Sequence, residues 1–173
     1  RLDEPLARHV TFGVGGPAEV FFAARTEDQL RGAYAIAKRF GVPVFIFGSG
    51  SNVLVGDKGI RGLVIENRTD QVEGPSQNGT GLKVRVASGV SFAALARRLS
   101  SSGYAGIEWA AGIPGSLGGA VVTNAGAYGR ALSDVLKTAR LADDHGDIVE
   151  MTPGELQLTY RNSAFTKGAV RDR

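Results

Sequence analysis

The chain has 173 residues, of which 43% are hydrophobic and 21% are charged, so it has the composition of a globular protein with enough apolar residues for a core. It contains no cysteine and only two histidines, which excludes disulfide frameworks, thiolate catalysis and cysteine-ligated metal centres, and we predict no metal site. Its net charge is +3 and its basic residues form no tract, so we expect no nucleic-acid partner.

The first part of the chain predicts a βαβ unit. Residues 18–23 have the apolar content of a strand, and Thr26 with Gln29 three positions later has the pattern of a capping box that opens a helix. Gly41 is expected at the end of that helix, before a continuous apolar strand at 42–47.

Two more apolar segments, 53–55 and 63–65, are expected as strands that complete this first unit. The polar segment 69–81, rich in glycine and small polar residues, is predicted to be a linker. We therefore expect one domain at 1–67 and a second at 68–173.

The second part begins with alternating residues at 82–87, which predict a half-buried strand, and Ser91 then caps a helix that ends at Gly103. Residues 136–141 and 148–151 are expected to pair as a hairpin. One βαβ unit followed by hairpins favours the α+β class over a doubly wound sheet.

A second capping box, Thr152 to Glu155, is expected to open a short helix before residues 159–163. The chain starts with neither a basic segment nor an apolar leader, so we expect no signal peptide. Residues 109–129 carry no charge, but Pro114 and several glycines would break a membrane helix, so we expect no membrane partner.

A glycine-serine loop follows the predicted buried strand at 42–47. Glycine lets the backbone pass close to a ligand, and successive N–H groups with serine hydroxyls can surround a pyrophosphate. The alternative is a plain tight turn, because the loop fits neither the Rossmann fingerprint nor the P-loop. The residues predicted to bind a cofactor here are Gly48, Ser49, Gly50, Ser51, Asn52 and Val53.

A second segment, 105–129, is unusually rich in glycine and alanine, which costs chain entropy without adding core volume. It is either a place of close backbone packing or a flat channel for a large planar or diphosphate ligand. The predicted cofactor-binding residues are Ala111, Gly112, Ile113, Pro114, Gly115, Ser116, Gly118, Gly119, Asn124 and Gly126.

A third segment, Tyr160-Arg161-Asn162-Ser163, contains an arginine whose guanidinium stays protonated at any working pH. It is either an ordinary surface cation or a group that stabilises negative charge in a reaction. His9 and His145 are assigned to turn and surface roles, because neither has a ligating residue nearby in the sequence.

These segments resemble, in order, the motifs of the bacterial UDP-N-acetylenolpyruvoylglucosamine reductases, which are flavoenzymes of peptidoglycan precursor synthesis. The resemblance lies in residues 9–18, 48–59, 112–129 and 160–163, and so covers nearly the whole chain. It implies a two-subdomain FAD-binding module of the type shared with vanillyl-alcohol oxidase and p-cresol methylhydroxylase. The family's substrate-binding domain, with its proton-donating serine and a second catalytic glutamate, is expected to follow this chain.

The resemblance also implies the chemistry. NADPH would reduce a non-covalently bound FAD, and the flavin would pass hydride to the enolpyruvyl ether of a UDP-sugar. Arg161 matches the family arginine that stabilises the enol-like intermediate, and Tyr128, Tyr160 and Arg161 are expected to contact the substrate. A cytoplasmic monomer is the expected state.

Two alternatives stay open. One is another FAD-linked sugar or alcohol oxidase on the same fold, although such enzymes often attach FAD covalently and this chain has neither a cysteine nor a histidine in the two glycine segments. The other is a nucleotide-binding module without catalytic activity.

Overall fold

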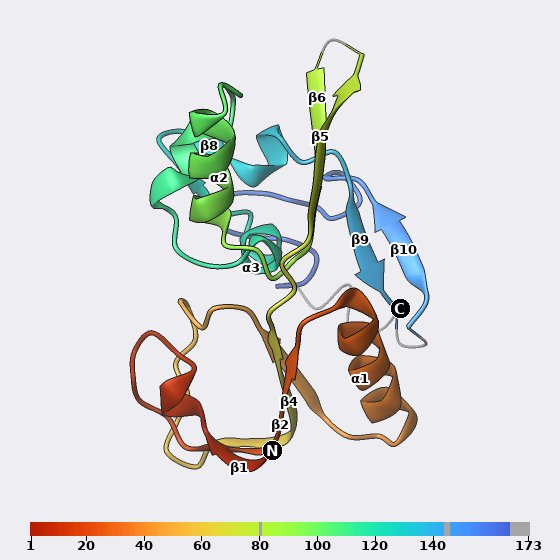
Figure 1. The fold of residues 1–173 in the computed structure, drawn as a ribbon. Helices are drawn as coiled ribbons and strands as arrows, with labels where there is room; N and C mark the ends of the chain where they lie inside the picture. The colour runs from red at the N-terminus through yellow and green to blue at the C-terminus, as the bar shows by residue number, and fades with distance from the viewer. Residues whose placement is uncertain (80, 144–145, 167–173) are drawn as a thin grey trace.

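The structure is a computed structural model that describes residues 1–79, 81–143 and 146–166. A four-stranded sheet with one helix lies at one end of the molecule, and a long hairpin with a second helix lies at the other (Figure 1). Between them run short helical turns, two glycine-rich segments and a second hairpin.

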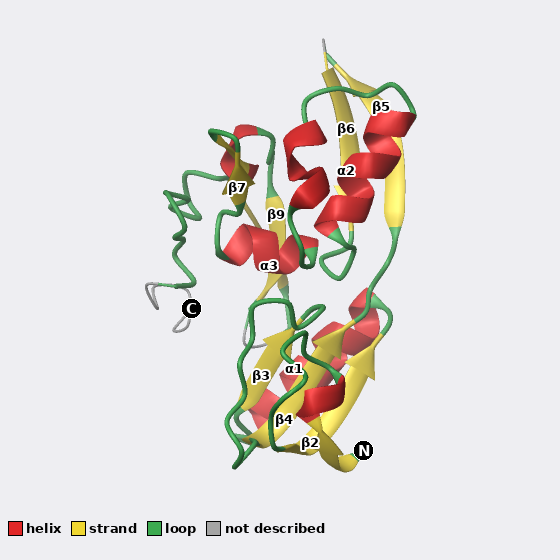
Figure 2. Ribbon diagram, turned by 90° about the vertical axis from the view of Figure 1, so that its left-hand side faces the viewer, coloured by secondary structure: helices red, strands yellow, loops and turns green. Residues whose placement is uncertain are grey.

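The sheet has the strand order β1-β2-β4-β3, in which β1 is antiparallel to β2 and the other neighbours are parallel. Helix α1 (Glu27–Arg39) connects β2 to β3 and covers one face, while the loops after β1 and β3 cover the other (Figure 2). The strands are β1 (Leu2–Pro5), β2 (Pro17–Ala24), β3 (Val44–Phe47) and β4 (Ile60–Asn67).

The predicted βαβ unit is confirmed, together with the signals that define its helix. The burial expected for its second strand is wrong, because β3 is an edge strand of the sheet and its Phe45 and Ile46 are 37% and 42% exposed. The Thr26 hydroxyl accepts a hydrogen bond of 3.2 Å from the Gln29 N–H, which satisfies one free donor of the first turn. After the last helical residue, Gly41 adopts a φ of +65° and turns the chain toward β3.

The strand expected at 53–55 is wrong, because these residues lie in the irregular loop between β3 and β4. The loop is fixed by a hydrogen bond of 3.0 Å from the Gly16 N–H to the Gly56 carbonyl. Val55 is 7% exposed and belongs to the core cluster under the sheet. Val53 also packs against this cluster, whereas Leu54 is 71% exposed, and no neighbouring strand pairs with the segment in the described residues.

The linker expected at 69–81 is wrong for most of its length. Residues from Val72 onward form β5 (Val72–Asn78), which pairs with β6 (Gly81–Val86) as an antiparallel hairpin. Only 68–71 connect the sheet to this hairpin. The hairpin projects from the body of the molecule (Figure 1). Its side chains are polar because they are exposed to solvent, as those of a linker would be.

Helix α2 (Phe92–Ser101) begins as predicted, with the Ser91 hydroxyl accepting a hydrogen bond of 3.3 Å from the Ala94 N–H. Its buried face contacts the 3-10 helix η2 (Glu108–Gly112), where the Phe92 and Trp109 rings meet edge to face at 5.7 Å. The remaining elements are η1 (Leu6–Arg8), α3 (Leu117–Val122), β7 (Gly126–Ala127), β8 (Arg130–Ala131), η3 (Leu132–Asp134), β9 (Ala139–Ala142) and β10 (Ile148–Met151).

The predicted second hairpin is confirmed as β9 and β10, although residues 144–145 at its turn lie outside the described residues. The capping box also forms, since the Thr152 N–H donates to a Glu155 carboxylate oxygen at 2.8 Å. The short helix expected after it is wrong. The segment makes a single turn and stops at Gln157, whose φ is +50°.

Two separate hydrophobic clusters stabilise the fold. One lies under the sheet and the other joins α2, η2 and α3. The first includes Leu6, Val10, Ala18, Phe21, Phe47, Val55 and Val64, and the second includes Phe92, Ala96, Ala110, Ala120, Ala125 and Leu132.

Hairpin β9–β10 also reaches α1, beside which it lies in Figure 1. The Arg140 guanidinium donates to both carboxylate oxygens of Glu27, at 3.0 and 3.3 Å, and Arg31 donates to the Gly146 carbonyl at 2.9 Å. The uncharged segment 109–129 folds into short elements, and none of the described helices has the length and apolarity needed to cross a bilayer.

Candidate functional site

The first glycine-serine loop leaves the carboxyl end of β3 and folds back on the chain after η1. The Gly50 carbonyl accepts a hydrogen bond of 3.1 Å from the Thr11 N–H. Within the described residues, the N–H groups of Ser49, Ser51 and Asn52 donate to no protein acceptor. Unpaired backbone N–H groups in a turn can form a concave anion site, which is the arrangement that the sequence predicts for a diphosphate at this loop.

The second glycine segment lies directly against this loop. A Cβ atom on Gly48 would overlap the Ser116 hydroxyl, and one on Gly115 would lie 3.0 Å from the Ser51 hydroxyl. The structure therefore brings together the two segments that the sequence predicted to share a ligand. Their contact leaves no room for larger side chains at Gly48.

Residues 115–118 are held from behind by the chain that precedes α2. The Leu117 N–H donates to the Val90 carbonyl at 2.8 Å, and the Gly118 N–H donates to the Ser88 carbonyl at 2.7 Å. A Cβ on Gly118 would lie 3.0 Å from the Ser88 Cβ. At Gly118 the close-packing alternative is therefore correct.

The other glycines of this segment differ from one another. A Cβ on Gly126 would overlap the Arg130 carbonyl across the β7–β8 pair, which is again packing of backbone against backbone. A Cβ on Gly112 would have no neighbour within 4 Å, so Gly112 borders open space. The Ala111 carbonyl beside it accepts a hydrogen bond of 2.7 Å from Arg97 of α2.

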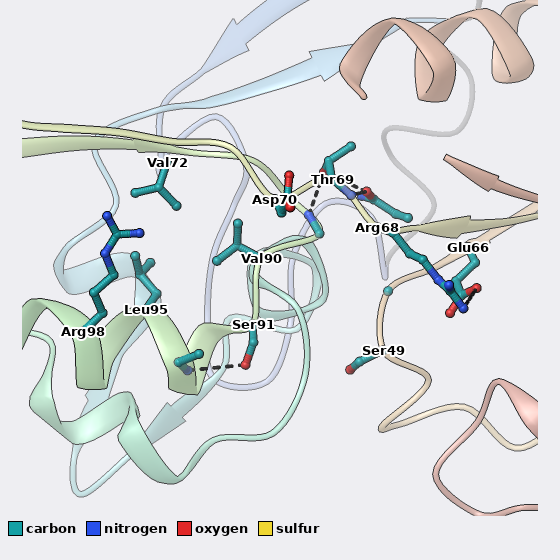
Figure 3. A pocket seen from close by; sticks show the side chains of 14 residues that line it. Ser49, Glu66, Arg68, Thr69, Asp70, Val72, Val90, Ser91, Leu95 and Arg98 are labelled. Atoms are coloured by element: carbon teal, nitrogen blue, oxygen red, sulfur yellow. Dashed lines mark hydrogen bonds and ion pairs between the residues drawn. The ribbon is translucent and has the colours of Figure 1, made fainter. Parts of the chain in front are cut away.

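A cavity of about 610 Å³ opens beside the first loop, between the sheet and α2 (Figure 3). This volume lies in the range of small-molecule sites. Arg68 and Arg98 stand on opposite sides, with Glu66 and Asp70 nearby (Figure 3). The walls are Gly48, Ser49, Glu66, Asn67, Arg68, Thr69, Asp70, Val72, Gly89, Val90, Ser91, Ala94, Leu95 and Arg98, so residues 111–119 do not line it.

Arg161 reaches the second glycine segment. Its guanidinium donates to the Gly126 carbonyl at 3.1 Å, and its own backbone is left-handed with a φ of +52°. Tyr128 has a similar φ of +53°, and non-glycine residues in this strained region concentrate at functional sites. Tyr128 and Tyr160 are 90% and 91% exposed, so both tyrosine side chains project into solvent.

The side-chain amide of Asn124 makes its hydrogen bonds to other parts of the protein. Its nitrogen donates to the Thr159 carbonyl and its oxygen accepts from the Ser133 N–H, both at 3.0 Å. The side chain is buried and ties the segment that carries Arg161 to the end of α3. Ser163 strengthens this attachment, since its hydroxyl donates to the Val122 carbonyl at 2.6 Å.

His9 lies in a turn at the end of η1, as predicted, but a surface role is wrong for its side chain. Its side chain is only 8% exposed, with Nε2 at 3.0 Å from a Glu4 carboxylate oxygen and Nδ1 at 3.3 Å from a Glu66 carboxylate oxygen. The hydrogen bond with His9, with help from the Arg1 guanidinium, lowers the pKa of Glu4. Sequence reasoning missed this cluster because Glu66 is distant along the chain. His145 lies outside the described residues.

Comparison with known proteins decides the family. Residues 18–152 match the family described as FAD binding domain. The chain belongs to the FAD binding domain family. FAD is thereby confirmed as the cofactor. The crystal structure of p-cresol methylhydroxylase, at 14% identity and a TM-score of 0.56, covers 94% of this chain and 33% of its own and confirms the predicted fold.

Several curated relatives with higher identity carry the same name. The chain is 40% identical over 167 residues to the UDP-N-acetylenolpyruvoylglucosamine reductase of Clostridioides difficile (strain 630), covering 96% of this chain and 54% of that protein. The crystal structure of the reductase from Thermus caldophilus matches with a TM-score of 0.72 at 32% identity, over 91% of this chain and 54% of its own. The predicted resemblance is confirmed. The chain spans about half the length of the curated relatives it matches.

Proposed function

We propose that this chain is the FAD-binding part of a UDP-N-acetylenolpyruvoylglucosamine reductase, which uses NADPH to convert the enolpyruvyl ether of a UDP-sugar into UDP-N-acetylmuramate. The observation that carries the proposal is the contact between the two glycine segments, with free N–H groups presented beside it. Relatives of that name at 40% identity support the same reading.

The first loop holds the diphosphate. Donors come from the N–H groups of Ser49, Ser51 and Asn52 and from the two serine hydroxyls, and the geometry of the loop is set before the ligand arrives. The second segment follows the flavin side, where Gly112 borders open space. FAD, when bound, supplies the two-electron carrier between NADPH and the substrate.

Arg161 is the proposed catalytic residue. Its guanidinium, aligned by the Gly126 carbonyl, stabilises the negative charge that develops on the enolpyruvyl group of the substrate as hydride arrives. A permanently protonated group suits this role, because it offers a fixed positive charge without gaining or losing a proton. Tyr128 and Tyr160, exposed on the same part of the chain, are proposed to contact the substrate.

We further propose a division into units at 1–67 and 68–173, which the two separate hydrophobic clusters support. The whole protein is proposed to act as a cytoplasmic monomer on its UDP-sugar, without nucleic-acid or membrane partners.

The test is the visible absorption spectrum of the purified chain after incubation with FAD and desalting. We expect a retained flavin band with resolved shoulders, because a flavin held in an apolar site absorbs differently from free flavin. Loss of all flavin, in this chain and in a longer one that includes the substrate-binding domain, would refute the proposal. Equal affinity for ADP and FAD, with an unchanged flavin spectrum, would indicate a nucleotide-binding module instead.

A further inference from the structure

The first glycine loop begins at the edge of the sheet where two neighbouring strands end together. Strands β3 and β4 are parallel, and Phe47 is in register with Glu66, so both strands leave the sheet at the same edge. Gly48 follows β3 directly, and Asn67 is the last residue of β4. A connection from the end of β4 to the second glycine segment would therefore set the distance between the two segments.

Asn67 and Thr69 make that connection through a network of four hydrogen bonds. The Asn67 side-chain oxygen accepts from the Thr69 N–H at 3.1 Å and from the Thr69 hydroxyl at 2.8 Å. The Asn67 amide nitrogen donates to the Ser88 hydroxyl at 2.8 Å. The Thr69 hydroxyl accepts from the Gly89 N–H at 3.0 Å (Figure 3). Asn67 and Thr69 are only 8% and 2% exposed, so the network is buried at its origin.

Gly89 is required by this contact and not by its own backbone conformation. Its φ lies outside the left-handed region. A Cβ there would nevertheless lie 2.5 Å from the Thr69 carbonyl oxygen and 2.8 Å from the Asn67 side-chain oxygen. Because one of these atoms belongs to the backbone, a side chain at this position would force residues 88–90 away from the end of β4.

Residues 88–92 are in turn bonded to the second glycine segment. The Ser88 carbonyl accepts from the Gly118 N–H at 2.7 Å, and the Phe92 N–H donates to the Gly115 carbonyl at 3.0 Å. Hydrogen bonds thus lead from the end of β4 through Ser88 to Gly118, while the first loop continues directly from β3. The two segments are both positioned from the same edge of the sheet.

We propose that Asn67 and Thr69 are positioning residues that set the spacing of the two glycine segments and thereby the affinity for FAD. The Thr69 hydroxyl and the Asn67 side-chain oxygen are bonded within the protein, so these side chains act through residues 88–90. Loss of the Thr69 hydroxyl leaves the Gly89 N–H without its acceptor, so residues 88–90 and the bonded second segment move away from β4. This inference rests on the flavin site proposed above.

The experiment measures the FAD dissociation constant of the full-length protein and of three variants. Thr69→Val keeps nearly the same shape without the hydroxyl and should bind FAD about tenfold more weakly. Thr69→Ser keeps the hydroxyl and should stay within about twofold of wild type. Gly89→Ala should weaken binding by about tenfold or more, because its methyl group separates residues 88–90 from Thr69.

Two control variants on helix α1 separate spacing from general effects. Ala37→Gly lowers the stability of the helix, because glycine is a poor helix former, and it leaves the network untouched. Gly32→Ala adds a methyl group where a Cβ would have no neighbour within 4 Å. Neither substitution should change the affinity for FAD.

Hydrogen exchange at the Gly118 amide gives a readout that needs no flavin. It should quicken in Thr69→Val and Gly89→Ala, and keep the wild-type rate in Thr69→Ser and Ala37→Gly. An unchanged Gly118 exchange rate in Thr69→Val, wild-type affinity in Gly89→Ala, or equal losses of affinity in Thr69→Ser and Thr69→Val would each overturn the inference. If wild type binds no FAD while Gly118 exchange still quickens in Thr69→Val, the flavin site fails and the spacing role of Thr69 stands.

Discussion

Replacing Gly50 with alanine tests whether the first loop is shaped by close contact. Gly50 has a φ of +64°, and the left-handed conformation costs a residue with a Cβ about 1–2 kcal/mol. The new Cβ would also lie 2.8 Å from the Val10 Cα, whereas carbon atoms in contact prefer about 3.5–4.0 Å, so the loop must retreat by about 1 Å. Such overpacking costs about 1–3 kcal/mol more.

Gly41→Ala is the matched control, because Gly41 has a φ of +65° and a Cβ there would have no neighbour within 4 Å. Urea denaturation followed by circular dichroism should give a loss of unfolding free energy of about 1–2 kcal/mol for Gly41→Ala and about 2–5 kcal/mol for Gly50→Ala. Only Gly50→Ala should lower the affinity for FAD, by about tenfold or more, since a displaced loop loses hydrogen bonds to a charged group of the cofactor. Equal effects of the two substitutions on stability, with unchanged FAD affinity, would refute the reasoning.

Three further predictions concern catalysis, packing and pH. In the full-length protein, Arg161→Ala should slow the reoxidation of flavin by the substrate about 10²-fold and leave the reduction of flavin by NADPH unchanged, as measured by stopped-flow absorbance. Equal losses of rate in both half-reactions would contradict the role of Arg161. Gly118→Val should lower the unfolding free energy by about 1–3 kcal/mol in the apoprotein, because its side chain meets the backbone of Ser88, and an unchanged urea midpoint would exclude that packing. Hydrogen bonds lower the pKa of four carboxyls, so the stability that these carboxylates add above their ordinary pKa values is lost as the pH falls through the lowered pKa values. Glu155→Gln should therefore flatten the decline of the urea midpoint at acid pH, and an unaltered slope would disprove this. The four are Glu4, Glu108, Asp134 and Glu155.

Local signals account for what the sequence predicted correctly. The caps of α1 and α2 depend on residues three positions apart, so Thr26 and Ser91 could be placed without knowledge of the fold. The glycine segments were found because their composition is costly in any ordinary structure. Their mutual contact, however, came from the tertiary fold.

The errors share a different cause. Val55 is buried in a hydrophobic core whose position cannot be read from the sequence. The residues of β5 are polar because their hairpin projects into solvent. His9 lies in the turn after η1, and one of the two carboxylates around its ring, Glu66, comes from the distant strand β4. In each case the environment of the residue is set by parts of the chain that lie far away in sequence, and local patterns carry no information about them.

The left-handed backbone of Tyr128 and Arg161 has a consequence for laboratory evolution. Each conformation costs free energy, and neither side chain recovers it through burial in this chain, since both are exposed. A library of this chain selected for resistance to protease alone should therefore accumulate glycine or asparagine at both positions. The same library, selected in full-length form for growth that depends on the enzyme, should retain the original residues, so the divergence between the two selections would map the active surface without any ligand.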